Sequence, residues 1–309
     1  MEMNFQGVMA ANVTPFTQDG SAVDHDALAH LGAWLSEVPG ITGVVCNGHA
    51  GEGTALSDRE RAEVVETLVG AVGGRVPVIA GIISEGTQLA AAEARRAAEV
   101  GAAATLVYPP HGWLRFGYQR QAPVDRYRAV AEESGLPQVL FQYPHATLAA
   151  YDLETVLEIC ELGTVVAIKN GVRNMSRWDD ELPIIRERFP DIKVVTCQDE
   201  FLLHTMWEAD GSLIGYASLV PELMVALQQA ATDQDYKRAK SLYDATGPLT
   251  KVIYHRTSHM EGTIALKMGL AARGILPHAT VRSPLFALSE DDDRAIRSAL
   301  EFAGVAVVG

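Results

Sequence analysis

Short apolar stretches alternate with longer amphipathic stretches along most of the chain, and this alternation restricts the fold more than any other feature. The apolar stretches are rich in β-branched residues, as expected of strands buried on both faces of a parallel sheet. They lie at residues 7–13, 43–46, 76–82, 104–108, 138–143, 165–169, 194–197 and 212–216. Between them, helical periodicity recurs, for example at residues 24–35, 57–72 and 87–100. Eight strands that are each followed by a helix predict a (β/α)8 TIM barrel, a fold of the α/β class.

A doubly wound open sheet is the alternative fold for such a pattern. It would be favoured by a glycine-rich phosphate-binding loop directly after the first strand. The residues at that place are Thr14-Pro15-Phe16-Thr17, which do not form such a loop. We therefore expect the barrel.

Three positions are predicted to start helices inside this pattern. Ser57-Asp58-Arg59-Glu60 is a capping box ahead of an apolar-periodic run. Asp152 and Thr87 are candidate N-cap residues of two further helices.

The strand pattern stops after Pro221, and amphipathic helices follow it. Candidate helices lie at residues 234–243, 262–273 and 291–302. We expect residues 1–222 to form the barrel and residues 223–309 to form a C-terminal helical extension, packed on the barrel as one compact unit.

The composition excludes several classes of function. The chain has 309 residues and a formal net charge of −14, whereas nucleic-acid binding requires a basic surface. No uninterrupted apolar stretch is long enough to span a bilayer, and the N-terminal residues do not resemble a signal peptide. Cys46, Cys160 and Cys197 are far apart and lack metal-ligand spacing with histidines, so we expect free thiols and no metal site. These features predict a cytoplasmic protein that binds neither nucleic acid nor membrane.

Lys169 is the clearest candidate for a catalytic residue in the sequence. It is one of six lysines, and it ends the apolar stretch 165–169 just before an Asn-Gly turn signal. Loss of hydration at such a place lowers the pKa of a lysine, and a neutral amine can attack a carbonyl group to form a Schiff base. The alternative is a lysine that pairs with a carboxylate or extends its amine to water.

Other reactive or polar residues also follow predicted strands, and in a barrel such residues gather around one mouth. They occur at residues 47–53, 108–113, 141–145 and 215–218. We therefore expect these segments to surround Lys169.

The order of the motifs makes the chain similar to a known family. It resembles the dihydrodipicolinate synthase / N-acetylneuraminate lyase family of class I, Schiff-base-forming aldolases over essentially its whole length. The matching motifs are Val13-Thr14-Pro15-Phe16, Gly48-x-x-Gly51-Glu52, Thr54-x-Leu56-Ser57-x-x-Glu60-Arg61, Pro77-Val78-Ile79-Ala80-Gly81, Tyr143-Pro144, Ile168-Lys169, Lys267-x-Gly269-Leu270 and Val281-Arg282-x-Pro284-Leu285. The resemblance implies a 2-oxo acid substrate, usually pyruvate, an imine on Lys169, no cofactor, and a homo-oligomer, either a dimer or a tetramer.

The chain departs from the family at the residues that move protons and bind the second substrate. The proton-shuttling tyrosine of the family falls on Phe141, and Tyr143 lies two residues further along the same face of the strand. The two hydroxyl residues of the carboxylate-binding loop fall on His49 and Ala50. The tyrosine that supports the relay falls on His111, and the arginine that binds the second substrate of the synthases falls on Ala146. Backbone N–H groups of this loop could still hold a carboxylate, and a protonated His49 would add a charge.

From these motifs we expect Lys169 and Tyr143 to be catalytic. The expected substrate-binding residues are His49, Ala50, Gly51, His111, Phe141, Gly215 and Tyr216. Structural roles remain the alternatives, with His49 capping its loop, His111 in a subunit contact and Tyr143 forming a pocket wall.

The predicted function is a lyase of the aldolase type that acts on pyruvate or another 2-oxo acid. Because Phe141 and Ala146 replace the usual tyrosine and arginine, we do not expect dihydrodipicolinate synthase activity itself, and we expect a substrate with a bulkier or less charged distal portion. One alternative is a 2-keto-3-deoxy sugar-acid dehydratase or a deaminase that uses the same imine. The other is a 2-oxo acid-binding protein with impaired catalysis.

Overall fold

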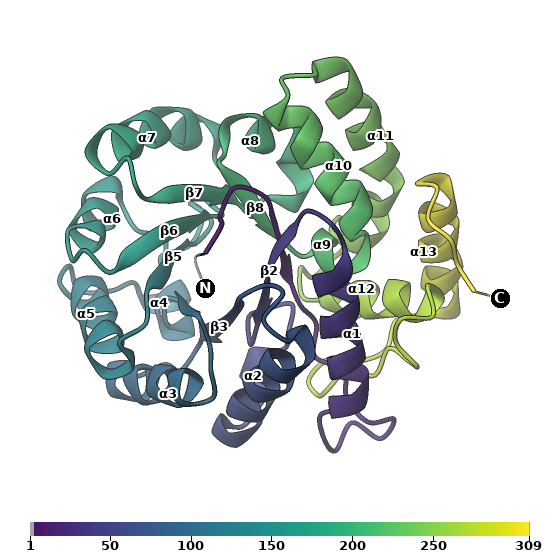
Figure 1. Cartoon of the computed structure of the whole chain (residues 1–309), viewed down its shortest axis with the longest axis horizontal. Coiled ribbons are helices and arrows are strands. Elements are labelled where there is room, and N and C mark those ends of the chain that lie inside the picture. Colours follow the sequence, from purple (N-terminus) through teal and green to yellow (C-terminus); the bar gives the residue numbers. More distant parts are fainter. Residues whose placement is uncertain (1–2, 309) are drawn as a thin grey trace.

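Eight parallel strands close into a barrel in the computed structural model, which describes residues 3–308 (Figure 1). Neighbours in sequence pair throughout, and β8 pairs with β1 to close the ring. The strands are β1 (Val8–Ala11), β2 (Ile41–Cys46), β3 (Val78–Ile82), β4 (Ala104–Val107), β5 (Gln138–Gln142), β6 (Val165–Asn170), β7 (Lys193–Thr196) and β8 (Gly211–Ile214). Each lies within or overlaps one of the apolar stretches, so the predicted (β/α)8 barrel is confirmed.

Helices surround the barrel and continue into the C-terminal part of the chain (Figure 1). Those up to β8 are α1 (His25–Glu37), α2 (Asp58–Val72), α3 (Thr87–Glu99), α4 (His111–Phe116), α5 (Ala122–Ser134), α6 (Leu153–Cys160), α7 (Met175–Arg188) and α8 (Leu202–Glu208). Those after β8 are α9 (Tyr216–Leu219), α10 (Pro221–Thr232), α11 (Tyr236–Ile253), α12 (Glu261–Ala272) and α13 (Glu290–Phe302). Within residues 3–308, none of the helices is both long enough and apolar enough to cross a membrane.

Two of the three predicted helix starts are confirmed. Ser57 forms the capping box with Glu60, and the Asp152 side chain accepts a hydrogen bond from the Thr155 N–H (2.7 Å). The prediction for Thr87 was wrong, because Gly86 occupies the N-cap position and Thr87 is already the first residue of α3. Glycine is tolerated at an N-cap, so no side-chain oxygen is needed there.

The apolar core has two layers. One fills the space between strands and helices, and the other fills the barrel interior with side chains such as Met9, Ile79 and Val195. In the interior layer, Phe141 of β5 lies opposite Lys169 of β6 in the strand register. Lys169 therefore belongs to the inward-facing row, at the end of the barrel where the strands terminate.

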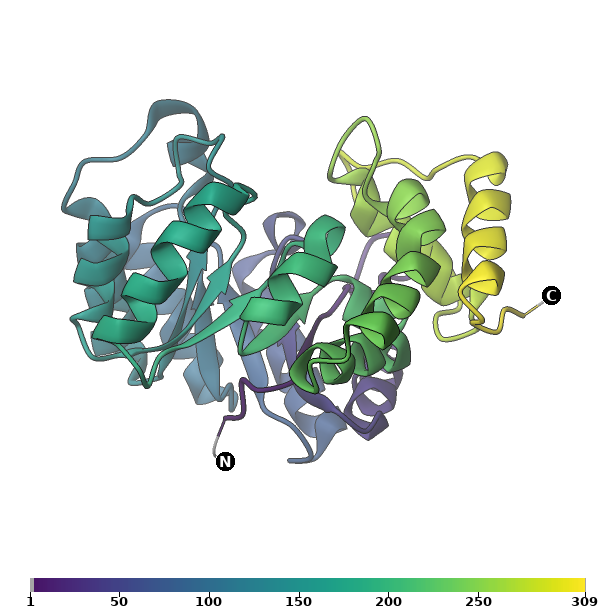
Figure 2. The same ribbon diagram turned by 90° about the horizontal axis from the view of Figure 1, so that it is seen from above.

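The helices after β8 form the predicted C-terminal extension beside the barrel (Figure 2). There α11, α12 and α13 pack against one another. By contrast, α10 begins next to the expected boundary at residue 222 and packs against α8 and β1 as well as α11. The placement of the boundary at residue 222 stays a prediction.

Candidate active site

A cavity of about 440 Å³ opens at the C-terminal ends of the strands. Both the barrel and the extension contribute to its wall. The residues that line it are Ala11, Asn12, Val45, Gly48, His49, Ala50, Gly51, Tyr108, His111, Leu114, Phe141, Tyr143, Pro144, Thr147, Lys169, Arg173, Cys197, Asp199, Leu213, Gly215, Tyr254, His259, Met260, Thr263 and Leu266. The structure thus brings together most of the residues predicted from the sequence.

Lys169 reaches this cavity from the end of β6. Only 8% of the residue is exposed, and its Nζ lies 4.6 Å from the centre of the Phe141 ring. In the sheet, Phe141 of β5 and Val195 of β7 lie on either side of it in the strand register. An amine at the inner end of a cavity can be reached by a carbonyl group while water is largely displaced.

An aromatic wall stands next to the lysine. Tyr108 and Phe141 contact each other edge to face, with ring centres 4.9 Å apart, and Tyr143 lies at the same distance from Phe141. The His49 ring packs edge-on against Tyr108 at 4.9 Å. As predicted, Phe141 and Tyr143 both face the cavity from β5 and the residues that follow it.

Polar contacts connect this wall to the loop after β3. Tyr143 Oη lies 2.9 Å from His49 Nε2, which lies 3.3 Å from His111 Nε2. On its other side, His111 Nδ1 lies 3.2 Å from the Glu85 carboxylate. Side chains from four separate loops or strand ends therefore form one continuous series of contacts.

The charge state expected for His49 is corrected by these surroundings. Burial, followed by the positive charge of Lys169, lowers the pKa of His49 to about 3, so the imidazole is neutral near pH 7. A neutral imidazole can accept and release a proton but adds no positive charge for a carboxylate. Burial also raises the pKa of Tyr143 above its ordinary value, so the phenol keeps its proton.

The loop after β2 has a tight backbone. Asn47 and Glu52 have φ values of 58° and 50°, and the N–H of Gly53 donates to the Gly48 carbonyl (3.0 Å). Gly48 is required here because a Cβ atom would lie 2.3 Å from Tyr108 Oη. Ala50 lines the cavity within this loop, and its contact with a substrate stays a prediction.

Glu52 fixes this loop through the extension. It is buried and paired with the buried Lys267 of α12, and its second oxygen accepts from the Arg282 N–H (3.0 Å). Lys267 also donates to the Thr280 carbonyl (2.9 Å). Through these contacts Glu52 holds the loop against the extension.

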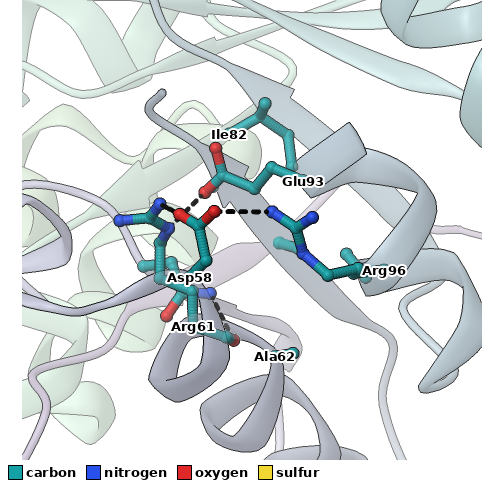
Figure 3. Close-up of a pocket in the computed structure, with 10 residues that line it drawn as sticks. Asp58, Arg61, Ala62, Ile82, Glu93 and Arg96 are labelled. Atoms are coloured by element: carbon teal, nitrogen blue, oxygen red, sulfur yellow. Dashed lines mark hydrogen bonds and ion pairs between the residues drawn. The ribbon is translucent and has the colours of Figure 1, made fainter. Parts of the chain in front are cut away.

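A second charged cluster supports the same loop from outside (Figure 3). Arg61 of α2 pairs with Glu93 of α3 (2.8 Å), and Asp58 pairs with both Arg61 and Arg96. Arg61 also donates to the carbonyl of Leu56 (2.7 Å). The space between these side chains is only about 10 Å³, so the cluster is a structural brace.

The cavity wall also contains polar residues that the sequence reasoning missed. Arg173 has φ of 46°, which is uncommon for arginine, and its Nη2 lies 3.3 Å from Glu200 Oε2 and 3.4 Å from His259 Nε2. Asp199 Oδ1 accepts from the Tyr254 hydroxyl group (3.0 Å), and burial raises the pKa of Asp199 to about 6. Asp199 lies three residues after the end of β7, so the rule used for the other strand ends could have found it. His259 lies in a loop of the extension and carried no signal.

Two positions from the sequence analysis lie elsewhere. The buried Tyr216 ring faces the extension, where its hydroxyl group donates to Thr250 Oγ1 (2.8 Å), so the predicted substrate contact has no support from this placement. Tyr216 instead supplies its backbone N–H to Asp199 (3.1 Å). Ala146 is exposed, and the cavity wall after β5 is formed by Pro144 and Thr147. Gly215 does line the cavity, and a Cβ atom there would lie 2.4 Å from Tyr254 Oη.

Comparison with known proteins agrees with this geometry. The model of the dihydrodipicolinate synthetase family matches residues 4–303. This chain belongs to the dihydrodipicolinate synthetase family. The 4-hydroxy-tetrahydrodipicolinate synthase of Psychrobacter arcticus is 31% identical over 306 residues, which cover 97% of this chain and 96% of that protein. The protein of the same name from Haloarcula marismortui is 32% identical over 299 residues, which cover 96% and 94%.

Solved structures of the family share the whole fold. The dihydrodipicolinate synthase of Aquifex aeolicus matches with a TM-score of 0.87 at 25% identity, covering 99% of this chain and 100% of that one. That of Acinetobacter baumannii, solved in complex with pyruvate, matches with a TM-score of 0.84 at 28% identity, covering 98% and 100%. This member of the family is a lyase of the class I aldolase type, as the sequence predicted.

Proposed function

We propose that this protein forms a Schiff base between Lys169 and pyruvate or another 2-oxo acid, and that it makes or breaks a bond next to the imine. The observation that carries the proposal is the buried Lys169 amine in a cavity that also holds the Tyr143 hydroxyl and the His49 imidazole. The amine supplies the nucleophile, and the other two groups supply sites for proton transfer. The pyruvate complex of the Acinetobacter baumannii synthase is consistent with such a substrate.

The reaction begins with attack of the Lys169 amine on the substrate carbonyl carbon, whose oxygen leaves as water. The resulting iminium accepts the electron pair of a neighbouring C–H or C–C bond, and an enamine forms. In this proposal, the backbone N–H groups of Ala50 and Gly51 hold the substrate carboxylate, because these residues line the cavity within the fixed loop. Gly215 leaves space for the substrate, and Phe141 covers the imine.

The distal portion of the substrate would lie toward Arg173, Asp199 and His259. This end of the cavity is polar, so we revise the expected substrate from a less charged distal portion to one that carries polar groups. We still do not propose the synthase reaction itself, because Phe141 has no proton to give and the exposed Ala146 offers no binding group.

Asp199 favours a second candidate, elimination of water or ammonia through the same imine. Its pKa of about 6 allows the carboxyl group to act as an acid or a base near neutral pH, and the residue lines the same cavity as Lys169. A 2-keto-3-deoxy sugar acid would be the substrate of such a dehydratase. We rank this second to aldol cleavage or condensation.

Borohydride trapping tests the proposal. The protein is incubated with a panel of 2-oxo acids that includes pyruvate, reduced, and analysed by intact mass and peptide mapping. We expect one adduct per chain, on the peptide that contains Lys169, and none in Lys169→Ala. Lys193→Ala, which changes the lysine at the start of β7, serves as the control and should trap normally. Equal trapping in Lys169→Ala would refute the assignment, and trapping without turnover of any acid in the panel would indicate the impaired binding protein.

By family resemblance we also propose a homo-oligomer, a dimer or a tetramer, and from the composition we propose a cytoplasmic location. Sedimentation velocity of the purified chain measures its state directly, and a monomer at micromolar concentration would contradict this proposal.

A further inference from the structure

Glu85 is the unexplained acidic residue at this site. It lies in the loop between β3 and α3, and 55% of its side chain is exposed to solvent. Its Oε1 accepts from the backbone N–H of His111 (2.7 Å) and its Oε2 from that of Gly112 (2.9 Å). The same Oε1 lies 3.2 Å from His111 Nδ1. One carboxylate thus holds both the backbone and the ring of His111.

A buried arginine fixes the position of this carboxylate. Arg126 is fully buried and donates to the carbonyl groups of Glu85 (3.1 Å) and Ser84 (2.6 Å). It also donates to the carbonyl of Tyr108 (3.0 Å), in the segment that leads to His111. The loops that carry Glu85 and His111 are therefore held by the same side chain, which favours a constant geometry between them.

The opposite nitrogen of the His111 ring faces the cavity. His111 Nε2 lies 3.3 Å from His49 Nε2, which lies 2.9 Å from the Tyr143 hydroxyl oxygen. Each step is short enough for proton transfer along a hydrogen bond or after a small closure. The series starts at the cavity that contains Lys169 and ends at a carboxylate in contact with water.

We propose that Tyr143, His49, His111 and Glu85 form the proton relay of this site, with Glu85 as the positioning residue for His111. This inference rests on the proposed imine chemistry. It assigns a role to a residue outside the cavity wall, and it explains how protons move although Phe141 stands where the family has its tyrosine.

The transfer balances along the series. When the C–H bond next to the imine breaks, its electron pair becomes the enamine double bond, and the C=N π pair moves to nitrogen. The Tyr143 oxygen takes the substrate proton while its own proton passes to His49 Nε2. The His49 ring then turns so that this N–H points at His111 Nε2, which takes the proton and restores neutral His49. The Nδ1 proton of His111 goes to the Glu85 carboxylate and then to water. The negative charge of Glu85 stabilises the cationic state of His111 during this passage. Protonation of the enamine follows the same path in reverse.

Hydrogen–deuterium exchange of the pyruvate methyl group tests the relay with pyruvate alone. The exchange in D2O is followed by proton NMR, and borohydride trapping is measured in parallel. We expect Glu85→Gln to slow the maximal exchange rate about ten-fold or more, as for other residues that orient a catalytic histidine or ligand. The pyruvate concentration for half-maximal rate and the trapping on Lys169 should not change. Glu161→Gln, which changes a similarly exposed glutamate in an ion pair with Arg188, should behave like the wild type.

Two further variants separate the relay from a structural role. Glutamine keeps only one of the two acceptor oxygens, so one of the N–H groups of His111 and Gly112 loses its partner in Glu85→Gln. A purely structural role therefore predicts that methyl exchange and pyruvate trapping fall together in Glu85→Gln, and fall further in Glu85→Ala. That result would overturn the relay. His111→Phe interrupts the same series without removing Glu85, and it should slow exchange as much as Glu85→Gln. Unchanged exchange in folded His111→Phe would also overturn it, as would a wild type that traps pyruvate but does not exchange its methyl hydrogens. A wild type that traps none of the 2-oxo acids would instead refute the proposed function.

Discussion

Lys267→Met is the substitution for which the structure gives the firmest magnitude. Lys267 and Glu52 are both buried and form an ion pair that joins α12 to the loop after β2. Removing the ammonium leaves the carboxylate of Glu52 buried with the Arg282 N–H as its remaining donor among the contacts described for residues 3–308. Loss of one partner of a buried pair costs about 3–5 kcal/mol. With an unfolding entropy of about 2.1 cal/mol/K per residue over 309 residues, this lowers the melting temperature by roughly 5–8 °C.

Differential scanning calorimetry measures the effect, with Lys251→Met as the matched control. Lys251 is exposed on α11, so its replacement should change the free energy of unfolding by less than about 0.5 kcal/mol. The double variant Lys267→Met/Glu52→Gln removes both charges and should recover part of the loss. The reasoning would be refuted if the melting temperature of Lys267→Met lay within 1–2 °C of the wild type. By the same conversion, such a shift is well below the expected loss of stability, and the pair would then not be needed for a stable fold.

Three further predictions concern the cavity. Asp199→Asn should raise the melting temperature at pH 8 but not at pH 4. The folded-state pKa of Asp199, about 6, lies above the usual value, so the stability that this carboxyl group contributes is present at low pH and is lost as pH rises through 6. A lower melting temperature of Asp199→Asn at pH 8 would contradict this. The His49 ring should remain neutral from pH 8 to pH 5, since its pKa is about 3, and nitrogen-15 NMR of the imidazole would show titration near pH 6.5 if the reasoning were wrong. Gly48→Ala should abolish or greatly slow adduct formation with pyruvate, because a Cβ atom would lie 2.3 Å from Tyr108 Oη, whereas Gly70→Ala, at a site with open space, should trap normally.

The fold was predictable from the sequence because a parallel barrel repeats one simple signal. Each strand is apolar on both faces and each helix is amphipathic, so the pattern does not depend on contacts between distant residues. The position of Lys169, His49, Ala50 and Tyr143 around one mouth followed from the same rule. The prediction for Tyr216 failed to find support because the residue begins α9, where its ring turns toward the extension.

The remaining site features depend on contacts that no local pattern carries. His259 reaches the cavity from a loop between α11 and α12, and nothing in its sequence neighbourhood indicates that position. The neutral state of His49 arises from burial and from Lys169, which lies far from it in the chain. Glu85 was overlooked because its importance comes only from its distance to His111.

The pairing of Glu52 with Lys267 has a consequence for the order in which the protein becomes active. The two residues are 215 positions apart, so a ribosome has produced the complete barrel, including Lys169, long before the partner of Glu52 emerges. Domains generally fold as units in the order of synthesis, and the barrel strands are available first. The loop that we propose for the substrate carboxylate gains its ion pair with Lys267 only once α12 has docked. A nascent chain would therefore carry the nucleophile without the means to hold a substrate beside it, and catalysis would begin only with the nearly finished polypeptide.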